Sequence, residues 1–209
     1  MSTSASDQRR TEILDAVVRV IIDIGFTDMT VADVAKAAGV SNALVHYHFT
    51  SKPELIEAAV QAASLDDRNF REAIARGPGT ATARLTDVLC DSLPGDAADG
   101  SWLLWVETWG ETRRHPGIRS VMSELDAHEV GTIVELIAEG EAAGEFTCDD
   151  HHDTATRLTA LRDGLAVDRT LFHDDVPAER TRTQLQRSLQ RNLGLSDVEY
   201  RALLAPPAT

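Results

Sequence analysis

The segment from Thr30 to Lys52, TVADVAKAAGVSNALVHYHFTSK, carries side chains that could bind DNA. Asn42 and His46 offer hydrogen-bond donors and acceptors for base edges in the major groove, and Ala43 is short enough to let a helix approach them. All three lie within Asn42–His48, which spans about two turns of a helix. Reading a base requires that this helix be held rigidly, so neighbouring elements must position it.

Two short helices joined by a tight turn are predicted here. Thr30 and Asp33 can form a capping box at the start of the first helix, and Ser41 can cap the second. Gly39 stands where the first helix must end, because a residue without a Cβ adopts the left-handed conformation of an exit turn at little cost. Counted from Val31, alanine is fifth, glycine ninth, and valine tenth and fifteenth. This spacing is typical of a DNA-binding helix-turn-helix.

Residues Gly25 to Lys52 resemble the amino-terminal domain of TetR-type (tetracycline-repressor-like) transcriptional regulators. The resemblance rests on GFTDMTVADVAKAAGVSNALVHYHFTSKPEL, in which a recognition helix ending in Tyr-His-Phe is followed by Ser-Lys at the start of the next helix. One position departs from the family, which often has tyrosine where this chain has His46. The resemblance implies a ligand-responsive repressor that binds a palindromic operator as a dimer and is released by a small molecule.

The resemblance also implies which residues touch DNA. It places phosphate contacts on Thr30, Tyr47, His48 and Lys52. The whole predicted DNA-binding set is Thr30, Ser41, Asn42, Ala43, Leu44, His46, Tyr47, His48 and Lys52.

Length and composition favour a globular protein of one or two domains. The 209 residues are 43% apolar and 26% charged, which is ordinary for a soluble protein. No apolar run reaches the ~18 residues of a membrane span, and the opening MSTSASDQRR lacks the apolar core of a signal peptide. Cys90 and Cys148 do not suggest a disulfide framework. We therefore expect a cytoplasmic protein with reduced thiols and no cofactor.

The net charge of −14 is unusual for a DNA-binding protein, because phosphate contacts are made mainly by basic groups. Residues 1–53 carry five basic and six acidic groups, which leaves 15 basic and 28 acidic groups in residues 54–209. Both lysines, Lys36 and Lys52, lie in the helix-turn-helix segment. Salt screens exposed charges beyond ~8 Å, so we expect an acidic body that does not prevent docking on DNA.

Apolar residues recur with helical spacing along the chain, and no segment shows strand alternation. We predict an all-α fold with an N-terminal three-helix helix-turn-helix DNA-binding domain, residues 1–53, and a C-terminal helical ligand-binding and dimerisation domain, residues 54–209. Ser51 and Glu54 can form a second capping box. The long helix that they open should run to about Ala75 and link the two domains.

The helix predicted over Ser101 to Arg114 carries all three tryptophans of the chain on one face. Core packing would explain them, but tryptophan also supplies flat walls and an N–H that needs a partner. Glu107 adds a charge that, if buried, must pair with an arginine or with a cationic ligand. Such a site would suit a cationic or aromatic effector. The predicted ligand-binding set is Trp102, Trp105, Trp109, Glu107 and Phe70.

Two predicted helices, one that ends at about His173 and one that begins at Pro177, keep apolar faces after the core is assigned. A single short recognition helix reads only a few base pairs, so useful specificity favours a homodimer on two half-sites. TetR-like proteins pair through a four-helix bundle, which the resemblance places on these helices. The predicted dimer interface is Leu161, Leu165, Phe172, Leu185 and Leu189.

Other functions compete with this interpretation. Cys148, His151 and His152 could ligate a metal, but acidic residues beside them suit the start of a helix, and we predict no metal site. An enzyme is not expected, because the sequence has no Gly-rich phosphate loop, G-x-S-x-G elbow or H-E-x-x-H pair. The alternative is a helical small-molecule-binding or scaffold protein without DNA binding. Salt-dependent operator binding would distinguish the two.

Overall fold

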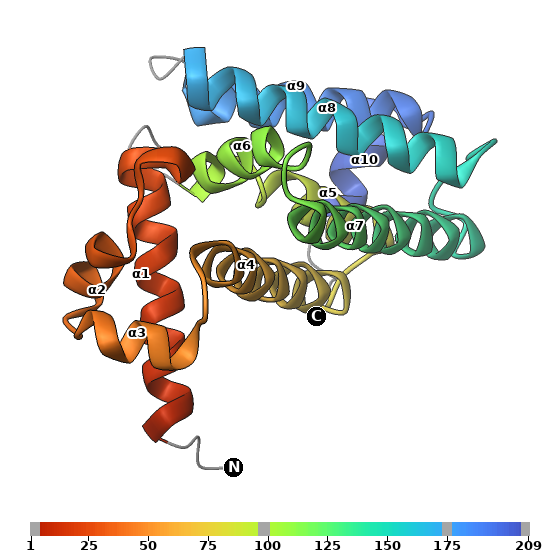
Figure 1. The fold of residues 1–209 in the computed structure, drawn as a ribbon. Helices are drawn as coiled ribbons and strands as arrows, with labels where there is room; N and C mark the ends of the chain where they lie inside the picture. Colours follow the sequence, from red (N-terminus) through yellow and green to blue (C-terminus); the bar gives the residue numbers. More distant parts are fainter. Residues whose placement is uncertain (1–4, 96–100, 173–176, 206–209) are drawn as a thin grey trace. The chain divides into compact units, whose positions relative to one another are not determined.

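The computed structural model describes residues 5–95, 101–172 and 177–205, and every regular element among them is a helix (Figure 1). The predicted all-α fold is confirmed. None of the helices in these ranges is long and apolar enough to cross a membrane. The helices are α1 (Ala5–Asp28), α2 (Val31–Ala38), α3 (Asn42–His48), α4 (Lys52–Ala75), α5 (Ala81–Cys90), α6 (Ser101–Glu111), α7 (Pro116–Ala142), α8 (His151–Phe172), α9 (Ala178–Asn192) and α10 (Asp197–Leu204).

The chain forms two compact units. Unit 1 comprises Met1–Asp67 and Leu103–Glu124, and unit 2 comprises Arg68–Trp102 and Leu125–Thr209. Because α4, α6 and α7 each contribute residues to both units, the units do not follow a single cut in the sequence. The predicted division between residues 53 and 54 concerns function and stays a prediction.

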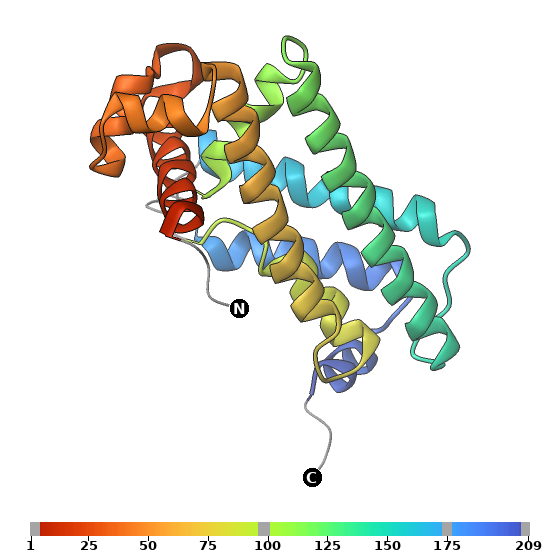
Figure 2. The ribbon, with the colours of Figure 1, turned by 60° about the horizontal axis from the view of Figure 1, so that its bottom comes forward.

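Unit 1 is built around the apolar face of α1. Ile13, Val17 and Ile21 follow that face at intervals of four residues and are fully buried. They belong to one cluster with Val45 of α3 and Leu55 of α4. Figures 1 and 2 show α1, α2 and α3 grouped beside the start of α4. Burial of each aliphatic side chain contributes about 1.5–3 kcal/mol, so this cluster holds α3 in place.

Unit 2 has a second core, which joins α5, α7, α8 and α9. Its fully buried members include Leu85, Ile137, Leu158 and Leu185. Polar groups also fasten α5 at its start, where the Glu145 carboxylate accepts the N–H groups of Ala81 (2.9 Å) and Thr82 (2.8 Å). These bonds satisfy helix-terminal donors that would otherwise be orphaned. The Cys90 and Cys148 thiols are free, and burial raises the pKa of Cys90 to about 12.

Candidate DNA-binding surface and effector site

The turn between α2 and α3 has the predicted geometry. At the start of α2 the Asp33 N–H donates to Thr30 Oγ1 (3.2 Å), and the Thr30 N–H donates to the Asp33 carboxylate (3.0 Å). The Thr30 hydroxyl, which also donates to the Asp33 carboxylate, and after it the Thr30 N–H lower the pKa of Asp33. Gly39 ends α2 in the left-handed conformation (φ 66°, ψ 34°). The Leu44 N–H donates to Ser41 Oγ (3.2 Å) and caps α3. The caps predicted at Thr30 and Ser41 and the glycine exit turn are confirmed. At the start of α4 the Glu54 N–H donates to Ser51 Oγ as predicted (3.3 Å), but the Glu54 carboxylate accepts from the Thr50 N–H (2.8 Å) instead of that of Ser51.

The helix α3 divides into a buried side and an exposed side. Val45 and, after the helix, Phe49 are 1% and 2% exposed and anchor it in the unit 1 core. The predicted base-reading residues Asn42, Ala43 and His46 are all exposed. A single apolar anchor on a two-turn helix thus leaves the opposite side available for a duplex.

Aromatic and imidazole side chains gather at the end of α3. Tyr47 is 78% exposed, an unusual state for so large a ring, and packs edge-on against the half-buried His48 with ring centroids 5.1 Å apart. Arg10 of α1 lies over Phe49, with its guanidinium carbon 5.2 Å from the ring centroid. Arg10 therefore brings a basic group beside the end of α3.

The remaining predicted phosphate contacts lie on either side of α3. Thr30 is exposed, and its hydroxyl donates to Asp33 (2.6 Å). Lys52 is half-buried, and its ammonium group donates to the carbonyl oxygen of Thr27 (3.2 Å). That single bond leaves two of the three ammonium donors for other partners. Of the other predicted residues, Ser41 is exposed and Leu44 is half-buried.

The five residues predicted for the effector site do not all fall in one unit. Phe70 and Trp102 belong to unit 2, and Trp105, Glu107 and Trp109 belong to unit 1. Trp102 is buried and donates its indole N–H to the carbonyl oxygen of Ser92 (2.7 Å).

The other four members of the set are more exposed than Trp102. Trp105 is half-buried, whereas Trp109 and Phe70 are 36% and 51% exposed. Glu107 is exposed, and its carboxylate lies against Gly25. Of the five, Trp102 therefore offers the buried aromatic wall.

Unit 2 contains a buried ion network that the sequence analysis did not identify. Arg162 of α8 is 2% exposed and donates to Glu129 of α7 (2.9 Å), which is 5% exposed. Arg71 of α4, 6% exposed, pairs with the same carboxylate. The Arg162 Nε–H donates to Asp163 (3.0 Å), and the guanidinium carbon lies 5.8 Å from the centroid of the Trp102 ring. The available signal was an arginine one turn after Leu158, on the side of the helix that carries its apolar residues.

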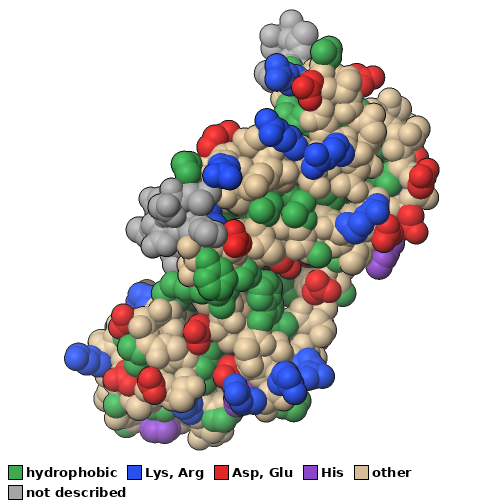
Figure 3. Space-filling model, turned by 90° about the horizontal axis from the view of Figure 1, so that it is seen from above, with side chains coloured by type: hydrophobic (Ala, Val, Ile, Leu, Met, Phe, Trp, Pro, Cys, Tyr) green, Lys and Arg blue, Asp and Glu red, His purple; other side chains and the backbone are tan. Residues whose placement is uncertain are grey.

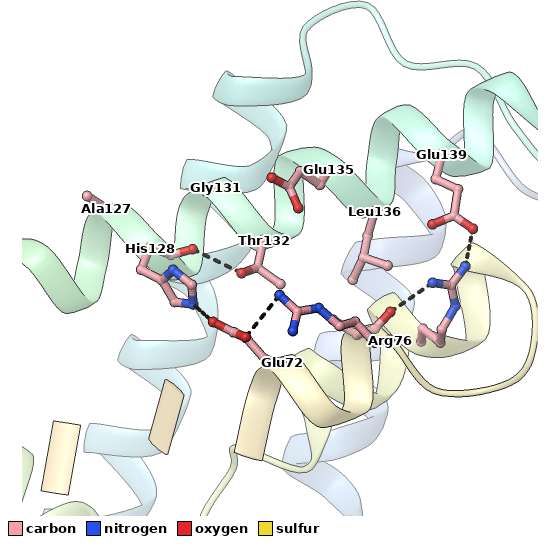
Figure 4. A pocket seen from close by; sticks show the side chains of 11 residues that line it. Glu72, Arg76, Ala127, His128, Gly131, Thr132, Glu135, Leu136 and Glu139 are labelled. Carbon is pink, nitrogen blue, oxygen red and sulfur yellow. Dashed lines mark hydrogen bonds and ion pairs between the residues drawn. The ribbon is translucent and has the colours of Figure 1, made fainter. Parts of the chain in front are cut away.

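A pocket of about 420 Å³ opens in unit 2 between the end of α4, α5 and α7 (Figure 4). Glu72 lies between His128 Nε2 (3.0 Å) and Arg76 (3.0 Å). On the far side Arg84 pairs with Glu139 and donates to the carbonyl oxygen of Ala75 (2.8 Å). Three carboxylates thus face two guanidiniums and an imidazole. The pocket residues are Glu72, Ala75, Arg76, Arg84, Ala127, His128, Gly131, Thr132, Glu135, Leu136 and Glu139.

The residues predicted for the dimer interface differ in exposure. Leu185 and Leu189 are 0% and 1% exposed and belong to the core of unit 2, which accounts for their apolar face. Leu161 and Leu165 are half-buried, and Phe172 is 68% exposed. Figure 3, seen from the side of α8 and α9 in Figure 1, shows hydrophobic side chains between basic and acidic ones. Only α8 therefore offers apolar surface from the predicted set.

Two of the residues that were considered as metal ligands, His151 and Cys148, have other partners. His151 Nε2 lies 2.8 Å from Glu141, and the Cys148 N–H donates to the same carboxylate (3.0 Å). The Cys148 hydrogen bond, with a smaller contribution from His151, lowers the pKa of Glu141. These contacts fasten the loop between α7 and α8. Among the described residues no cluster of three or more His, Cys, Asp or Glu side chains could hold a metal ion.

Comparisons with known proteins agree with this arrangement. Residues 13–59 match the family model for bacterial regulatory proteins of the tetR family, and residues 81–194 match the C-terminal model for BetI-type transcriptional repressors. The HTH-type transcriptional regulator BetI of Escherichia coli (strain K12) is 24% identical over 177 residues, covering 83% of this chain and 87% of the relative. BetI of Rhizobium meliloti (strain 1021) is 30% identical over 115 residues, covering 54% of this chain and 57% of the relative.

Two solved structures share both the fold and part of the sequence. A protein from Saccharomonospora viridis, described as a transcriptional regulator in complex with choline, superposes with a TM-score of 0.82 at 28% identity and covers 90% of this chain and 98% of its own. A protein from Rhodococcus sp., described as a TetR-family transcriptional regulator, has a TM-score of 0.76 at 28% identity, and the match covers 90% of this chain and 99% of that protein.

Proposed function

This chain belongs to the TetR family of bacterial regulatory proteins, with a carboxy-terminal part of the BetI-type transcriptional repressor class, and from that premise we propose that it is a repressor released from its operator by a small organic cation. The observation that carries the proposal is α3, a capped helix anchored by Val45 with its polar side exposed. The relatives that the chain matches are transcriptional regulators and not enzymes.

In the proposed complex α3 lies in the major groove. Asn42 and His46 contact base edges, while Ala43 permits close approach and Ser41 and Leu44 form the start of the helix. Tyr47, His48, Thr30 and Lys52 contact phosphates on either side. The exposure of Thr30 and Tyr47 supports this role, as do the donors that the half-buried Lys52 keeps beyond its bond to Thr27. Phosphate contacts position the helix, and the base contacts specify the sequence.

The functional form is a homodimer on a palindromic operator. Leu161, Leu165 and Phe172 of α8 are the apolar residues of the predicted set that remain at least partly accessible. Pairing through α8 would bury them and bring two copies of α3 to two half-sites. Because its target is chromosomal DNA, the protein acts in the cytoplasm.

The effector binds in unit 2 and is a small organic cation. The buried Trp102 ring already lies against a guanidinium, and Glu129 and Asp163 supply carboxylates to the same network. An aromatic face with carboxylates beside it favours positive charge. A structure 28% identical to this chain is described in complex with choline, which has this chemistry. We use choline as the probe of this class.

Fluorescence anisotropy with DNA from the region upstream of the gene tests the proposal. Binding should weaken steeply as salt rises, and choline should release the complex, whereas equimolar sodium chloride should not. A protein that binds choline but shows no salt-dependent DNA binding would be the alternative, a small-molecule-binding protein without DNA binding. Choline that is chemically altered after incubation, followed by proton NMR, would instead indicate an enzyme.

A further inference from the structure

We propose that Arg162 is a built-in competitor of the effector, and that its guanidinium occupies the cation position on Trp102 until a ligand displaces it. The proposal rests on the proposed function, because it describes how a cationic effector is recognised and how its binding is reported. It assigns Arg162 a role that packing alone would not require.

The geometry around Trp102 is that of an occupied cation site. The Arg162 guanidinium carbon lies 5.8 Å from the ring centroid, within the range of a cation–π contact. The indole N–H is bound to the carbonyl oxygen of Ser92, which fixes the ring. Glu129 and Asp163 supply the counter-charges that a buried cation needs. An aromatic wall with a carboxylate is the arrangement that a small ammonium ion also requires.

The buried charges favour a ligand that replaces the Arg162 guanidinium over one that binds in addition to it. Glu129 is 5% exposed and already serves two guanidiniums, those of Arg71 and Arg162. Among the described residues, Glu129 and Asp163 are the carboxylates bonded to these guanidiniums, so a third cation beside them would add a buried charge that neither is placed to neutralise, which is strongly unfavourable. Exchange of one cation for another leaves the buried charge unchanged. The ligand therefore binds as Arg162 leaves, and the long side chain of arginine can carry its guanidinium towards solvent.

The exchange would alter the helices that the network joins. Trp102, Glu129 and Arg162 come from α6, α7 and α8, and Arg71 comes from α4. When Arg162 leaves, Arg71 no longer shares the Glu129 carboxylate. The helix that carries Arg71 begins at Lys52, and only three residues separate it from α3. A ligand changes operator affinity only if it favours one arrangement of such elements over another, and displacement of Arg162 supplies that preference.

NMR on the unaltered full-length protein tests the exchange directly. The Nε–H of Arg162, bonded to Asp163 at 3.0 Å and buried, should give a resonance that exchanges slowly with water. Loss of that signal in Arg162→Gln assigns it. Saturating choline should shift the resonance and speed its exchange at least about tenfold, as expected when a buried group becomes exposed. An unchanged and protected signal at saturation overturns the proposal.

Calorimetry with choline provides a second, independent measurement. Arg162→Gln removes the competitor while Glu129 keeps Arg71, so choline should bind about tenfold more tightly, a change that corresponds to about 1.4 kcal/mol. Arg201→Gln, an exposed arginine of α10, is the matched control and should bind choline like the parent. Equal or weaker binding by Arg162→Gln contradicts the competitor role. If Arg162→Gln does not fold, triple-resonance correlation through the arginine side chain assigns the Arg162 Nε–H in the parent, and the exchange measurement on the parent then decides.

The outcomes separate this inference from the proposed function. If choline binds the parent and releases the operator while the Arg162 signal stays protected, the inference fails and the proposed function stands. If choline binds neither the parent nor Arg162→Gln, the cationic effector is wrong and the inference fails with it.

Discussion

Replacing Glu129 by glutamine should destabilise the protein much more than replacing a surface carboxylate. Glu129 is 5% exposed and pairs with Arg71 and Arg162, which are 6% and 2% exposed. Glutamine keeps the shape but removes the charge that the two guanidiniums share. Breaking a buried ion pair lowers the free energy of unfolding by about 3–5 kcal/mol. Because Asp163 remains bonded to Arg162, we expect a loss at the lower end of this range, about 3 kcal/mol. For a chain of this length, that lowers Tm by about 6–12 °C.

Scanning calorimetry and urea unfolding measure this change. The matched control is Asp153→Asn, which breaks the ion pair between Asp153 and Arg157. Both of these side chains are 59% exposed, so the control should lower the free energy of unfolding by less than about 1 kcal/mol. A Glu129→Gln protein that melts within about 2 °C of the parent would refute the reasoning. Replacing Arg71, Glu129 and Arg162 together by methionine should lower stability less than Glu129→Gln alone, because neither guanidinium is then left in the core without the Glu129 carboxylate.

Four further outcomes are expected. Lys52→Ala should weaken binding to all DNA sequences similarly and lower the salt slope by about one, and equal slopes in anisotropy titrations would remove Lys52 from the phosphate contacts. Gly39→Ala should lower stability by about 1–2 kcal/mol in thermal melts, because Gly39 has φ 66° and a side chain is strained there, and an unchanged melt would contradict this. Burial raises the pKa of the Cys90 thiol to about 12, so iodoacetamide at pH 8 should label Cys148 and spare Cys90 until the protein unfolds, as peptide mass mapping can show. Leu165→Arg should turn a dimer into a monomer in sedimentation at micromolar concentration, and a dimer that persists would place the interface elsewhere.

The features predicted best from the sequence are those that depend on neighbouring residues. Thr30, Asp33, Gly39 and Ser41 each act within four residues of their partners, so residue type and spacing were enough to predict the caps and the exit turn. The buried face of α1 follows from periodicity in the same way. Local chemistry therefore accounts for most of the candidate DNA-binding surface.

The features that the sequence left open depend on partners far along the chain. Arg162 meets Glu129 from 33 residues away, and Arg71 meets it from 58 residues away. No periodic pattern encodes such pairings. The apolar face of Leu185 and Leu189 was predicted correctly as apolar, but spacing does not say whether a core or a second copy covers it. In this chain the core of unit 2 covers both residues.

The buried charges also bear on the proposed response of unit 2 to a small cation. A core made only of close-packed leucine and isoleucine has one favoured arrangement and interacts little with an ammonium ion, so a cation could not favour one state over another. In the proposed exchange the network has two arrangements of similar charge, the observed one with Arg162 on Trp102 and a second with the effector in its place. Retaining buried ion pairs rarely improves stability over apolar packing. Their presence between α4, α6, α7 and α8 is therefore better explained by a role in switching than by a role in stability. A triple methionine variant that is as stable as the parent, but whose operator complex choline does not release, would support this explanation.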